Sequence, residues 1–442
     1  MTVINKFQRQ FSPQKLKKIY TEHIQLSGAI GIDNRNQKGF WPIQDDEINI
    51  ISRKVISANY KFTKYKLKLI SKGRGKPPRE ISIPTIRDRI TLRALCDFLS
   101  SCFKSSIKFE LPQDVVCAVK ENVSSNTYDG FVKLDVTNFY PTIKHDELNS
   151  RLRKRIKEPK ILELINNAIS TPTVVRSHAS DIPMSKGVPQ GLAISNILSA
   201  IYLLNIDSYM KKQSNLRFYR YVDDVLILCE HKKAEEIAQS LIKRFKKIGL
   251  EIHDPIKVPD KSQIGHITEK FDFLGYEFDN GLISCRKGSV DKLRESIISI
   301  FNGYKYADKK NADFLLWRLD MRITGCIFEN KCKGWLFYFS EMNNESLLHQ
   351  LDAFVTNLTK RFNAKIKPKK FVRSHYEIKH HRNETKYIPN FDSYSLEQMQ
   401  DVLNKYFNMD LSKLTENEIE YEFKKRIKRQ AKDLLQDVQD FS

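Results

Sequence analysis

Apolar side chains recur with a helical period in some segments of this chain and crowd into short runs in others. Residues 195–210 place apolar side chains near every third or fourth position, which predicts a buried helix. Residues 234–250 carry one apolar stripe at this spacing and predict a second helix. Residues 131–141 begin with a dense apolar run and predict a buried strand that ends at or just after Asp135.

A pair of adjacent aspartates, Asp223 and Asp224, lies between two apolar segments. Tyr221 and Val222 precede the pair and residues 225–228 follow it, which predicts a β-hairpin that presents its turn to solvent. Neighbouring carboxylates repel each other, and a hard divalent cation such as Mg²⁺ removes that repulsion. Plain solvated turns also use aspartate freely, so the interpretation as a metal site depends on a further carboxylate.

Asp135 is that further carboxylate, although an aspartate on the solvent face of an alternating strand would show the same pattern. Two metal ions roughly 3.5–4 Å apart need shared carboxylates, and they activate the attacking and leaving oxygens of an in-line phosphoryl displacement. Asp135, Asp223 and Asp224 together predict a clamp of this kind.

Three motifs in the same order resemble those of reverse transcriptases. Asp135 in Leu-Asp-Val-x-x-Phe-Tyr resembles the first catalytic aspartate of that family, and Tyr-Val-Asp-Asp resembles its Y-x-D-D box. Between them, residues 187–196 resemble the P-Q-G loop that packs against the template and the incoming nucleotide. The resemblance implies that Asp135, Asp223 and Asp224 are catalytic. It also implies that these carboxylates and the backbone carbonyl of Val136 hold two Mg²⁺ ions, with Mn²⁺ as an alternative metal.

The resemblance also assigns contacts to the incoming nucleotide, at Lys72, Arg79, Tyr140, Gln190 and Lys257. Residues 75–85 resemble the basic fingers strand, where the guanidinium of Arg79 suits bidentate phosphate recognition. Tyr140 occupies the sugar-gate position, where an aromatic ring excludes a ribose 2′-hydroxyl; a core aromatic is the alternative. A solvated loop lysine is the alternative for Lys72, and Lys261 lies close to Lys257 along the chain.

The resemblance, which covers residues 28–280, implies an α+β fold of the right-hand polymerase type. Fingers and palm would combine an antiparallel sheet with helices, and a mostly helical thumb and C-terminal extension would follow. We expect an N-terminal extension and fingers over residues 1–98, and a palm over residues 99–289 with a fingers excursion near 146–182. The helical thumb and basic C-terminal region are expected over residues 290–442.

The chain carries a strong excess of positive charge. Its 442 residues include 75 Lys and Arg against 53 Asp and Glu, and the net charge of +22 favours a polyanion such as nucleic acid as partner. A membrane surface is the rival partner, but no long apolar run or lipidation motif supports it. The seven cysteines form no Cys-x-x-Cys pair, which favours reduced thiols in the cytoplasm.

Positive charge is concentrated near the predicted thumb. Residues 360–386 contain ten Lys or Arg against two Glu, with Phe362, Phe371 and Tyr376 interleaved. A charge run is often only a solvated face, but aromatics among basic residues are typical of RNA binding. The pattern predicts RNA contacts at Lys365, Lys367, Lys369, Lys370 and Arg373.

Residues 135–143 and 191–196 resemble the abortive-infection and unknown-group branch of bacterial reverse transcriptases, which is related to retron and group II intron enzymes. Membership implies an RNA-directed DNA polymerase that makes cDNA from dNTPs on a companion structured noncoding RNA, in anti-phage defence. A retron or group II intron reverse transcriptase or maturase is one alternative, and untemplated DNA polymerisation is another. A non-catalytic RNA-binding or splicing factor is a rival of a different class, and the intact aspartates argue against it. The oligomeric state stays open.

Overall fold

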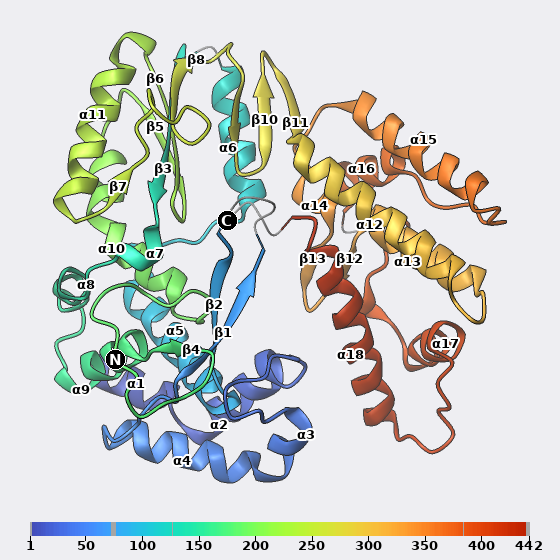
Figure 1. The fold of residues 1–442 in the computed structure, drawn as a ribbon, viewed down its shortest axis with the longest axis horizontal. Coiled ribbons are helices and arrows are strands. Elements are labelled where there is room, and N and C mark those ends of the chain that lie inside the picture. The colour runs from blue at the N-terminus through green and yellow to red at the C-terminus, as the bar shows by residue number, and fades with distance from the viewer. Residues whose placement is uncertain (1, 72–76, 126, 383, 439–442) are drawn as a thin grey trace. The chain divides into compact units, whose positions relative to one another are not determined.

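The computed structural model describes residues 2–71, 77–125, 127–382 and 384–438 (Figure 1). The chain folds into two compact units that interleave in the sequence. The first unit comprises Met1–Phe109 and Gly130–Gly265, and the second comprises Glu110–Asp129 and His266–Ser442. Residues 110–129 therefore fold with the C-terminal part of the chain, although the segments on either side of them belong to the first unit.

The first unit begins with helices and continues with alternating strands and helices. Its helical elements are α1 (Val3–Gln10), α2 (Pro13–Ile19), the π-helix η1 (Tyr20–Ile24), α3 (Gln37–Phe40), the 3₁₀-helix η2 (Trp41–Ile43), α4 (Gln44–Ile56), α5 (Ile86–Phe103), α7 (Phe139–Thr142), α8 (His145–Leu152), α9 (Pro159–Ser170), α10 (Ser195–Met210) and α11 (His231–Lys247). Its strands are β1 (Tyr65–Ile70), β2 (Arg79–Ile83), β3 (Gly130–Thr137), β4 (Thr173–Val174), β5 (Arg217–Tyr221), β6 (Asp224–Cys229), β7 (Glu251–Ile252) and β8 (Gln263–His266), whose last residue is assigned to the second unit.

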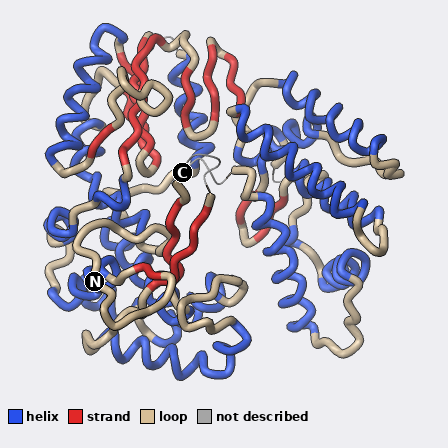
Figure 2. Tube along the Cα trace, in the orientation of Figure 1, coloured by secondary structure: helices blue, strands red, loops and turns tan. Residues whose placement is uncertain are grey.

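Two sheets organise the first unit (Figure 2). The larger sheet has the order β5-β6-β3-β7, and β8 also pairs with β3. In it, β3 pairs antiparallel with both β6 and β7, and β5 pairs antiparallel with β6. The smaller sheet has the order β2-β1-β4, with β1 antiparallel to β2 and parallel to β4.

The two faces of β3 differ in character. Val132, Leu134 and Val136 share one face, because alternate residues of a strand point the same way. All three are buried in the apolar core that also contains α10 and α11, which lie beside the larger sheet (Figure 1). Phe131 and Asp135 point to the opposite face. The strand is thus anchored by its apolar residues while it turns Asp135 away from that core.

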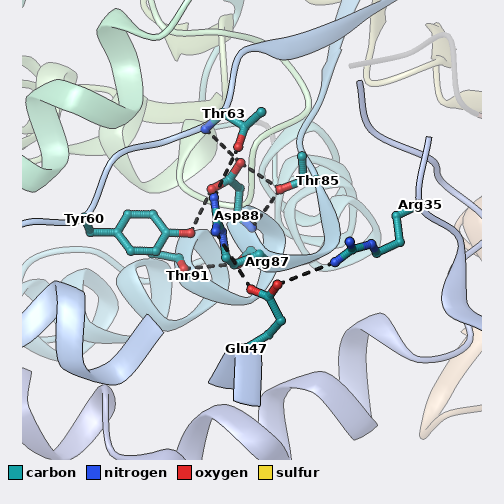
Figure 3. Close-up of polar contacts among 8 residues, drawn as sticks. All are labelled: Arg35, Glu47, Tyr60, Thr63, Thr85, Arg87, Asp88 and Thr91. Atoms are coloured by element: carbon teal, nitrogen blue, oxygen red, sulfur yellow. Dashed lines mark hydrogen bonds and ion pairs between the residues drawn. The ribbon is translucent and has the colours of Figure 1, made fainter. Parts of the chain in front are cut away.

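A buried carboxylate, Asp88 in α5, fastens the segment that leads into β1 (Figure 3). Its Oδ1 accepts a hydrogen bond from the Tyr60 hydroxyl at 2.8 Å. Its Oδ2 accepts from the Thr85 hydroxyl at 2.8 Å and from the Thr63 backbone N–H at 3.1 Å. Burial raises the pKa of Asp88 although these donors oppose the rise. The Asp88 carboxylate therefore links α5 to Tyr60 and Thr63 in the segment before β1, and to Thr85 between β2 and α5.

Glu47 on α4 adds ion pairs beside this carboxylate (Figure 3). Its two carboxylate oxygens lie 3.5 Å from Arg35 Nη1 and 3.8 Å from Arg87 Nη1. Partly exposed pairs at these distances stabilise a protein by about 1 kcal/mol at most. The buried hydrogen bonds of Asp88 are thus the stronger constraint on the start of β1.

The second unit is mainly helical and has two small sheets (Figure 2). Its helices are α6 (Pro112–Ser124), α12 (Lys287–Lys305), α13 (Ala312–Thr324), α14 (Trp335–Tyr338), α15 (Glu345–Arg361), α16 (Phe371–His380), the 3₁₀-helix η3 (Phe391–Ser393), α17 (Leu396–Phe407) and α18 (Glu416–Leu434). Its strands β9 (Phe271–Phe273), β10 (Tyr276–Asp279) and β11 (Leu282–Cys285) form one antiparallel sheet, and β12 (Cys326–Phe328) pairs with β13 (Lys331–Lys333).

A buried aromatic cluster and a buried ion pair stabilise the second unit. Trp335 and Phe339 are buried with ring centroids 4.9 Å apart, and Trp335 Nε1 donates to the Ser289 hydroxyl at 2.9 Å. Arg322 on α13 pairs with Asp437 at 2.6 Å, and both side chains are less than a tenth exposed. Removing one partner of such a pair leaves an uncompensated buried charge. The pair therefore fastens the segment after α18 to α13.

The predicted α+β fold class and most predicted elements are confirmed. Residues 195–210 form α10 with the predicted bounds, and α11 begins three residues before its predicted start. β3 continues to Thr137, two residues beyond Asp135. The division into fingers, palm and thumb stays a prediction. Within the ranges that the structure describes, no helix is both long and apolar enough to cross a membrane.

Replacing Asp88 by alanine should lower the free energy of unfolding by about 2–4 kcal/mol, because three donors lose a buried acceptor. Asp97→Ala on the same helix is the matched control and should cost about 0.5 kcal/mol, since it removes a partly exposed pair with Arg93. Urea denaturation followed by circular dichroism measures both losses.

The same comparison has a predicted pH dependence. The pKa of Asp88 is raised in the folded state, so folding favours its protonated form. The advantage of the wild type over Asp88→Ala should be largest below the unfolded pKa and should shrink as the pH rises through the folded pKa. Equal losses for Asp88→Ala and Asp97→Ala would contradict the assigned role of Asp88.

Candidate active site

The pairing of β3 with β6 brings two of the predicted aspartates together. Asp135 pairs directly with Asp224 at the last position of this ladder. Residues directly opposite in antiparallel strands point to the same face, with Cβ atoms about 4.5–5.5 Å apart. Asp223 lies in the turn between β5 and β6, next to the pair formed by Tyr221 and Asp224. The three predicted carboxylates therefore lie at one end of the larger sheet.

The turn that carries Asp223 has a strained backbone. Val222 has a φ of 56°, in the left-handed region that β-branched residues rarely adopt. Its carbonyl accepts a hydrogen bond from Arg220 Nη1 at 2.7 Å. Arg220 also forms an ion pair with Asp207 on α10, with its Nε 2.7 Å from Oδ1 and its Nη2 on Oδ2. Because strain persists only where its surroundings hold it, we infer that the Arg220–Asp207 pair fixes this turn.

Positive charge and hydrogen bonds surround Asp135. Its Oδ2 lies 3.2 Å from Lys261 Nζ and 3.6 Å from His253 Nε2. Its backbone N–H donates to the buried Ser262 hydroxyl at 3.1 Å, and its carbonyl accepts from the His253 N–H at 3.0 Å. This half-buried carboxylate is thus fixed through its backbone on the β7 side of β3.

The carboxylates disfavour each other's charge. Burial raises the pKa of Asp223, and the charge of Asp135 adds to the rise, whereas Arg79 and Lys261 oppose it. Oxygen donors under this mutual repulsion fit a hard divalent cation. Among the described residues, no three Asp, Glu, His or Cys side chains already surround one metal position. The fit to a metal therefore rests on the donor chemistry and on the shared face of Asp135 and Asp224.

The backbone carbonyl of Val136, which is also a predicted metal ligand, points toward the side of the sheet where Asp223 lies. The Asp135 carbonyl points toward β7, where it accepts from His253. Successive peptide groups of a strand point to opposite sides, so the Val136 carbonyl points toward the β6 side. That is the side on which the turn with Asp223 lies.

Tyr140 lies in α7, which follows β3 directly. Its hydroxyl donates to Oδ1 of Asn196 at 2.6 Å, at the start of α10. Burial raises the pKa of Tyr140 to about 12, and the charge of Asp223 contributes to the rise. The ring also contacts Phe139, with centroids 5.4 Å apart. The ring is thus held by its contacts with Asn196 and Phe139 and experiences the charge of Asp223, and its role as a sugar gate stays a prediction.

The loop of residues 187–191 forms hydrogen bonds both with Tyr140 and with β2, the strand that carries Arg79. A loop N–H donates to the Tyr140 carbonyl at 2.9 Å, and the Gln190 carbonyl accepts from the Ser82 N–H at 2.7 Å. Gly191 has a φ of 97°, and a Cβ there would lie 2.8 Å from a side-chain carbon of β2. Glycine is therefore required where the loop crosses the strand, and these bonds link the regions of Tyr140, Gln190 and Arg79.

The two predicted lysines are less informative. Lys72 lies outside the described residues. Lys257 is exposed, and its backbone N–H lies 3.4 Å from Asp254 Oδ1. The lysine ammonium beside Asp135 belongs to Lys261. Lys261 is thus the better placed of the two neighbouring lysines to contact a phosphate at the carboxylates.

The predicted RNA contacts all belong to the second unit. Lys365, Lys367, Lys370 and Arg373 are exposed. Lys369 differs, because its Nζ donates to the Tyr387 carbonyl at 2.6 Å and burial lowers its pKa. Four of the five cations are therefore accessible to a ligand, and Lys369 is engaged within the protein.

Sequence reasoning missed the residues that support the carboxylates. Asp207 is the only charged residue in the sequence of residues 195–210, and Arg220 directly precedes the Y-x-D-D box. A charge inside a predicted buried element needs a partner, and this rule could have linked the two. The contact of Ser262 with Asp135 spans 127 residues and had no local signal.

Residues 70–278 match the family model described as reverse transcriptase (RNA-dependent DNA polymerase). The matched span contains Asp135, Asp223 and Asp224, with Tyr140 and Gln190 between them. The chain therefore carries a reverse transcriptase domain, and the predicted enzyme class is confirmed. Domains of this family use divalent metal ions.

Two kinds of curated protein show distant similarity. Protein YkfC of Escherichia coli (strain K12) is 24% identical over 298 residues, which cover 56% of this chain and 74% of YkfC. The putative COX1/OXI3 intron 1 protein of Saccharomyces cerevisiae is 23% identical over 175 residues, which cover 38% of this chain and 21% of that protein. The chain thus spans about a fifth of the intron protein.

Solved telomerase structures also resemble the chain weakly. Apo telomerase from Candida tropicalis aligns with a TM-score of 0.44 and 14% identity, over 86% of this chain and 65% of that chain. Telomerase from Candida albicans, solved with a fragment of telomeric RNA, aligns with a TM-score of 0.42 and 13% identity, over 89% and 68%. Scores this low support no conclusion about function.

Replacing Tyr140 by alanine should raise the use of ribonucleotides relative to deoxynucleotides by roughly ten-fold, because the ring that is predicted to exclude the 2′-hydroxyl is lost. Tyr140→Phe is the matched control: it keeps the ring, loses the hydrogen bond to Asn196 and should keep the wild-type ratio. Competition between dNTP and rNTP in primer extension measures the ratio of kcat/KM. An unchanged ratio in Tyr140→Ala would mean that the ring is only part of the core.

Replacing Arg220 by glutamine should lower kcat for primer extension by about 10–100-fold, with a smaller change in KM, because the turn with Asp223 is no longer held. Arg217→Gln is the matched control, since Arg217 is exposed on the same strand. Steady-state kinetics on both variants check this. If the two variants lost the same activity, the support of the turn would have to lie elsewhere.

Proposed function

We propose that this protein is an RNA-directed DNA polymerase that makes cDNA from dNTPs by two-metal phosphoryl transfer. The observation that carries the proposal is the pairing of Asp135 with Asp224, with Asp223 in the adjoining turn. Positioning and electrostatics supply most of the catalysis in phosphoryl transfer. A rigid sheet end with three carboxylates is suited to that task.

Two Mg²⁺ ions, or Mn²⁺, would be held by Asp135, Asp223, Asp224 and the Val136 carbonyl, and would stabilise the charge on the reacting phosphate oxygens. Arg79 would bind the triphosphate through its guanidinium. Tyr140 would exclude a 2′-hydroxyl, and Gln190 would position template and nucleotide. Lys261 has the better geometry for a phosphate contact than Lys257, while Lys72 keeps its predicted role as a second such contact.

We further propose that the template is a companion structured noncoding RNA and that the cDNA serves anti-phage defence. The support is the resemblance of residues 135–143 and 191–196 to the defence-associated branch, together with the net charge of +22. The exposed cations Lys365, Lys367, Lys370 and Arg373 would contact that RNA. None of the seven cysteines, all of which the structure describes, forms a disulfide, and this suits a cytoplasmic location.

A group II intron enzyme is the second candidate function. The similarity to an intron protein of Saccharomyces cerevisiae favours it. Sequence beside the gene distinguishes the two: intron boundaries would favour the intron enzyme, and a structured RNA without them would favour defence. Extension without template RNA would instead indicate untemplated synthesis.

Asp223→Asn and Asp224→Asn should each abolish primer extension on an RNA template with Mg²⁺, because the site loses negative charge. RNA binding should remain within roughly two-fold of wild type, since surface charge elsewhere supplies it. Asp260→Asn, an exposed aspartate of the same unit, is the matched control and should extend normally. Wild-type rates in both site variants would overturn the catalytic assignment. A wild type that binds RNA but extends no primer would favour the non-catalytic alternative.

A further inference from the structure

A groove runs between α15 and α16 in the second unit. Its volume is about 690 Å³, within the range of sites that hold small molecules or parts of larger ligands. α15 contributes His349, Thr356 and Asn357 to its lining, and the start of α16 contributes Arg373 and Tyr376. The groove lies far along the chain from Asp135, and none of its residues belongs to the domain matched at residues 70–278.

Two exposed cations lie in this groove. Lys370 precedes α16 and Arg373 lies in its first turn, and both line the groove. The Arg373 side chain is 61% exposed and forms an ion pair with Glu377 on the same helix. A guanidinium has five N–H donors, so Arg373 retains donors for a phosphate.

The one carboxylate in the lining, Asp352, is committed to the protein. Its Oδ1 accepts from the Phe371 N–H at 2.6 Å and its Oδ2 lies 3.5 Å from the Val372 N–H. These bonds cap the N-terminus of α16, where the helix dipole favours negative charge. Burial raises the pKa of Asp352, with the capping bonds opposing the rise. The N-terminus of α16 therefore partly offsets the negative charge of Asp352. This carboxylate repels an anionic ligand less than an isolated carboxylate would.

Tyr376 gives the groove an exposed aromatic face. It is 49% exposed although it lies on a helix whose neighbouring residues Phe371 and Ile378 are buried. The Arg373 guanidinium lies 5.7 Å from its ring centroid, and the His380 ring lies 4.8 Å away. An exposed aromatic ring beside an arginine is a usual stacking platform for unpaired bases.

We propose that this groove binds single-stranded RNA, with a base stacked on Tyr376 and phosphates at Lys370 and Arg373. The carboxamide of Asn357 offers both a donor and an acceptor, which suits a base edge or a ribose 2′-hydroxyl. The proposal deepens the proposed function, because RNA is the template in that function. It assigns to α15 and α16 an unpaired stretch of the RNA, separate from the site of synthesis.

Fluorescence anisotropy with a labelled oligouridylate of roughly 12 nucleotides tests this on the full chain without dNTPs. Tyr376→Ala should weaken binding by about five-fold or more, as expected for one lost base stack. Tyr376→Phe should bind like wild type. Tyr306→Ala is the matched control, because Tyr306 is also exposed, also lies beside a lysine ammonium, and does not line the groove.

Two further ligands sharpen the result. An abasic strand of the same length should bind the wild type more weakly, and Tyr376→Ala should have no further effect on it. Oligothymidylate should bind more weakly than oligouridylate; equal affinity would overturn the assignment to RNA and indicate single-stranded DNA. Unchanged oligouridylate binding by Tyr376→Ala, with an unchanged circular dichroism spectrum, would overturn the groove as a base-binding site. The binding assay contains no dNTPs and measures no synthesis. Either failure would therefore leave the test of polymerase activity with the Asp223 and Asp224 variants unaffected.

Discussion

The register between β3 and β6 is the constraint on which the candidate active site depends. A slip of one residue would turn Asp135 into the apolar core shared with α10 and α11, and would move Leu134 out of that core to the opposite face of the sheet. The apolar residues Val132, Leu134 and Val136 prevent that slip, because each has a buried position to occupy. The carboxylates are thus placed by the burial of their neighbours rather than by attraction for each other.

Acids that repel one another are held here by surrounding cations and by strained backbone. Lys261 lies at Asp135, and Arg79 acts on Asp223 across the site. The left-handed Val222 is held by Arg220, and Arg220 by Asp207. Each link brings in a different element of the first unit, so the site is maintained by the unit as a whole.

Local patterns predicted the elements well and the long-range contacts poorly. The bounds of α10 and the strand around Asp135 follow from periodicity, which depends only on neighbours along the chain. The adjacency of Asp135 and Asp224 came from family motifs, since spacing alone could not pair strands almost ninety residues apart. The support from Ser262 had no local signal because its partner Asp135 lies 127 residues away. Asp207 and Arg220 are only 13 residues apart, but helix and strand periodicity does not indicate which charges pair. The basic and aromatic composition of the region around α16 predicted RNA binding there. It did not predict the groove, because the groove is formed by the packing of α15 and α16.

The interleaving of the two units has a consequence for biosynthesis. α6 is made early, but its partners in the second unit come more than 200 residues later: Gln113 bonds to the Phe337 carbonyl and Lys120 pairs with Glu341. At about 5–20 residues per second, a ribosome needs roughly 10–45 seconds to supply them. During that interval the apolar side of α6, with Val115, Val116 and Val119, has no finished core to enter. The nascent chain therefore exposes an apolar helix face, which chaperones would have to cover until the C-terminal part emerges.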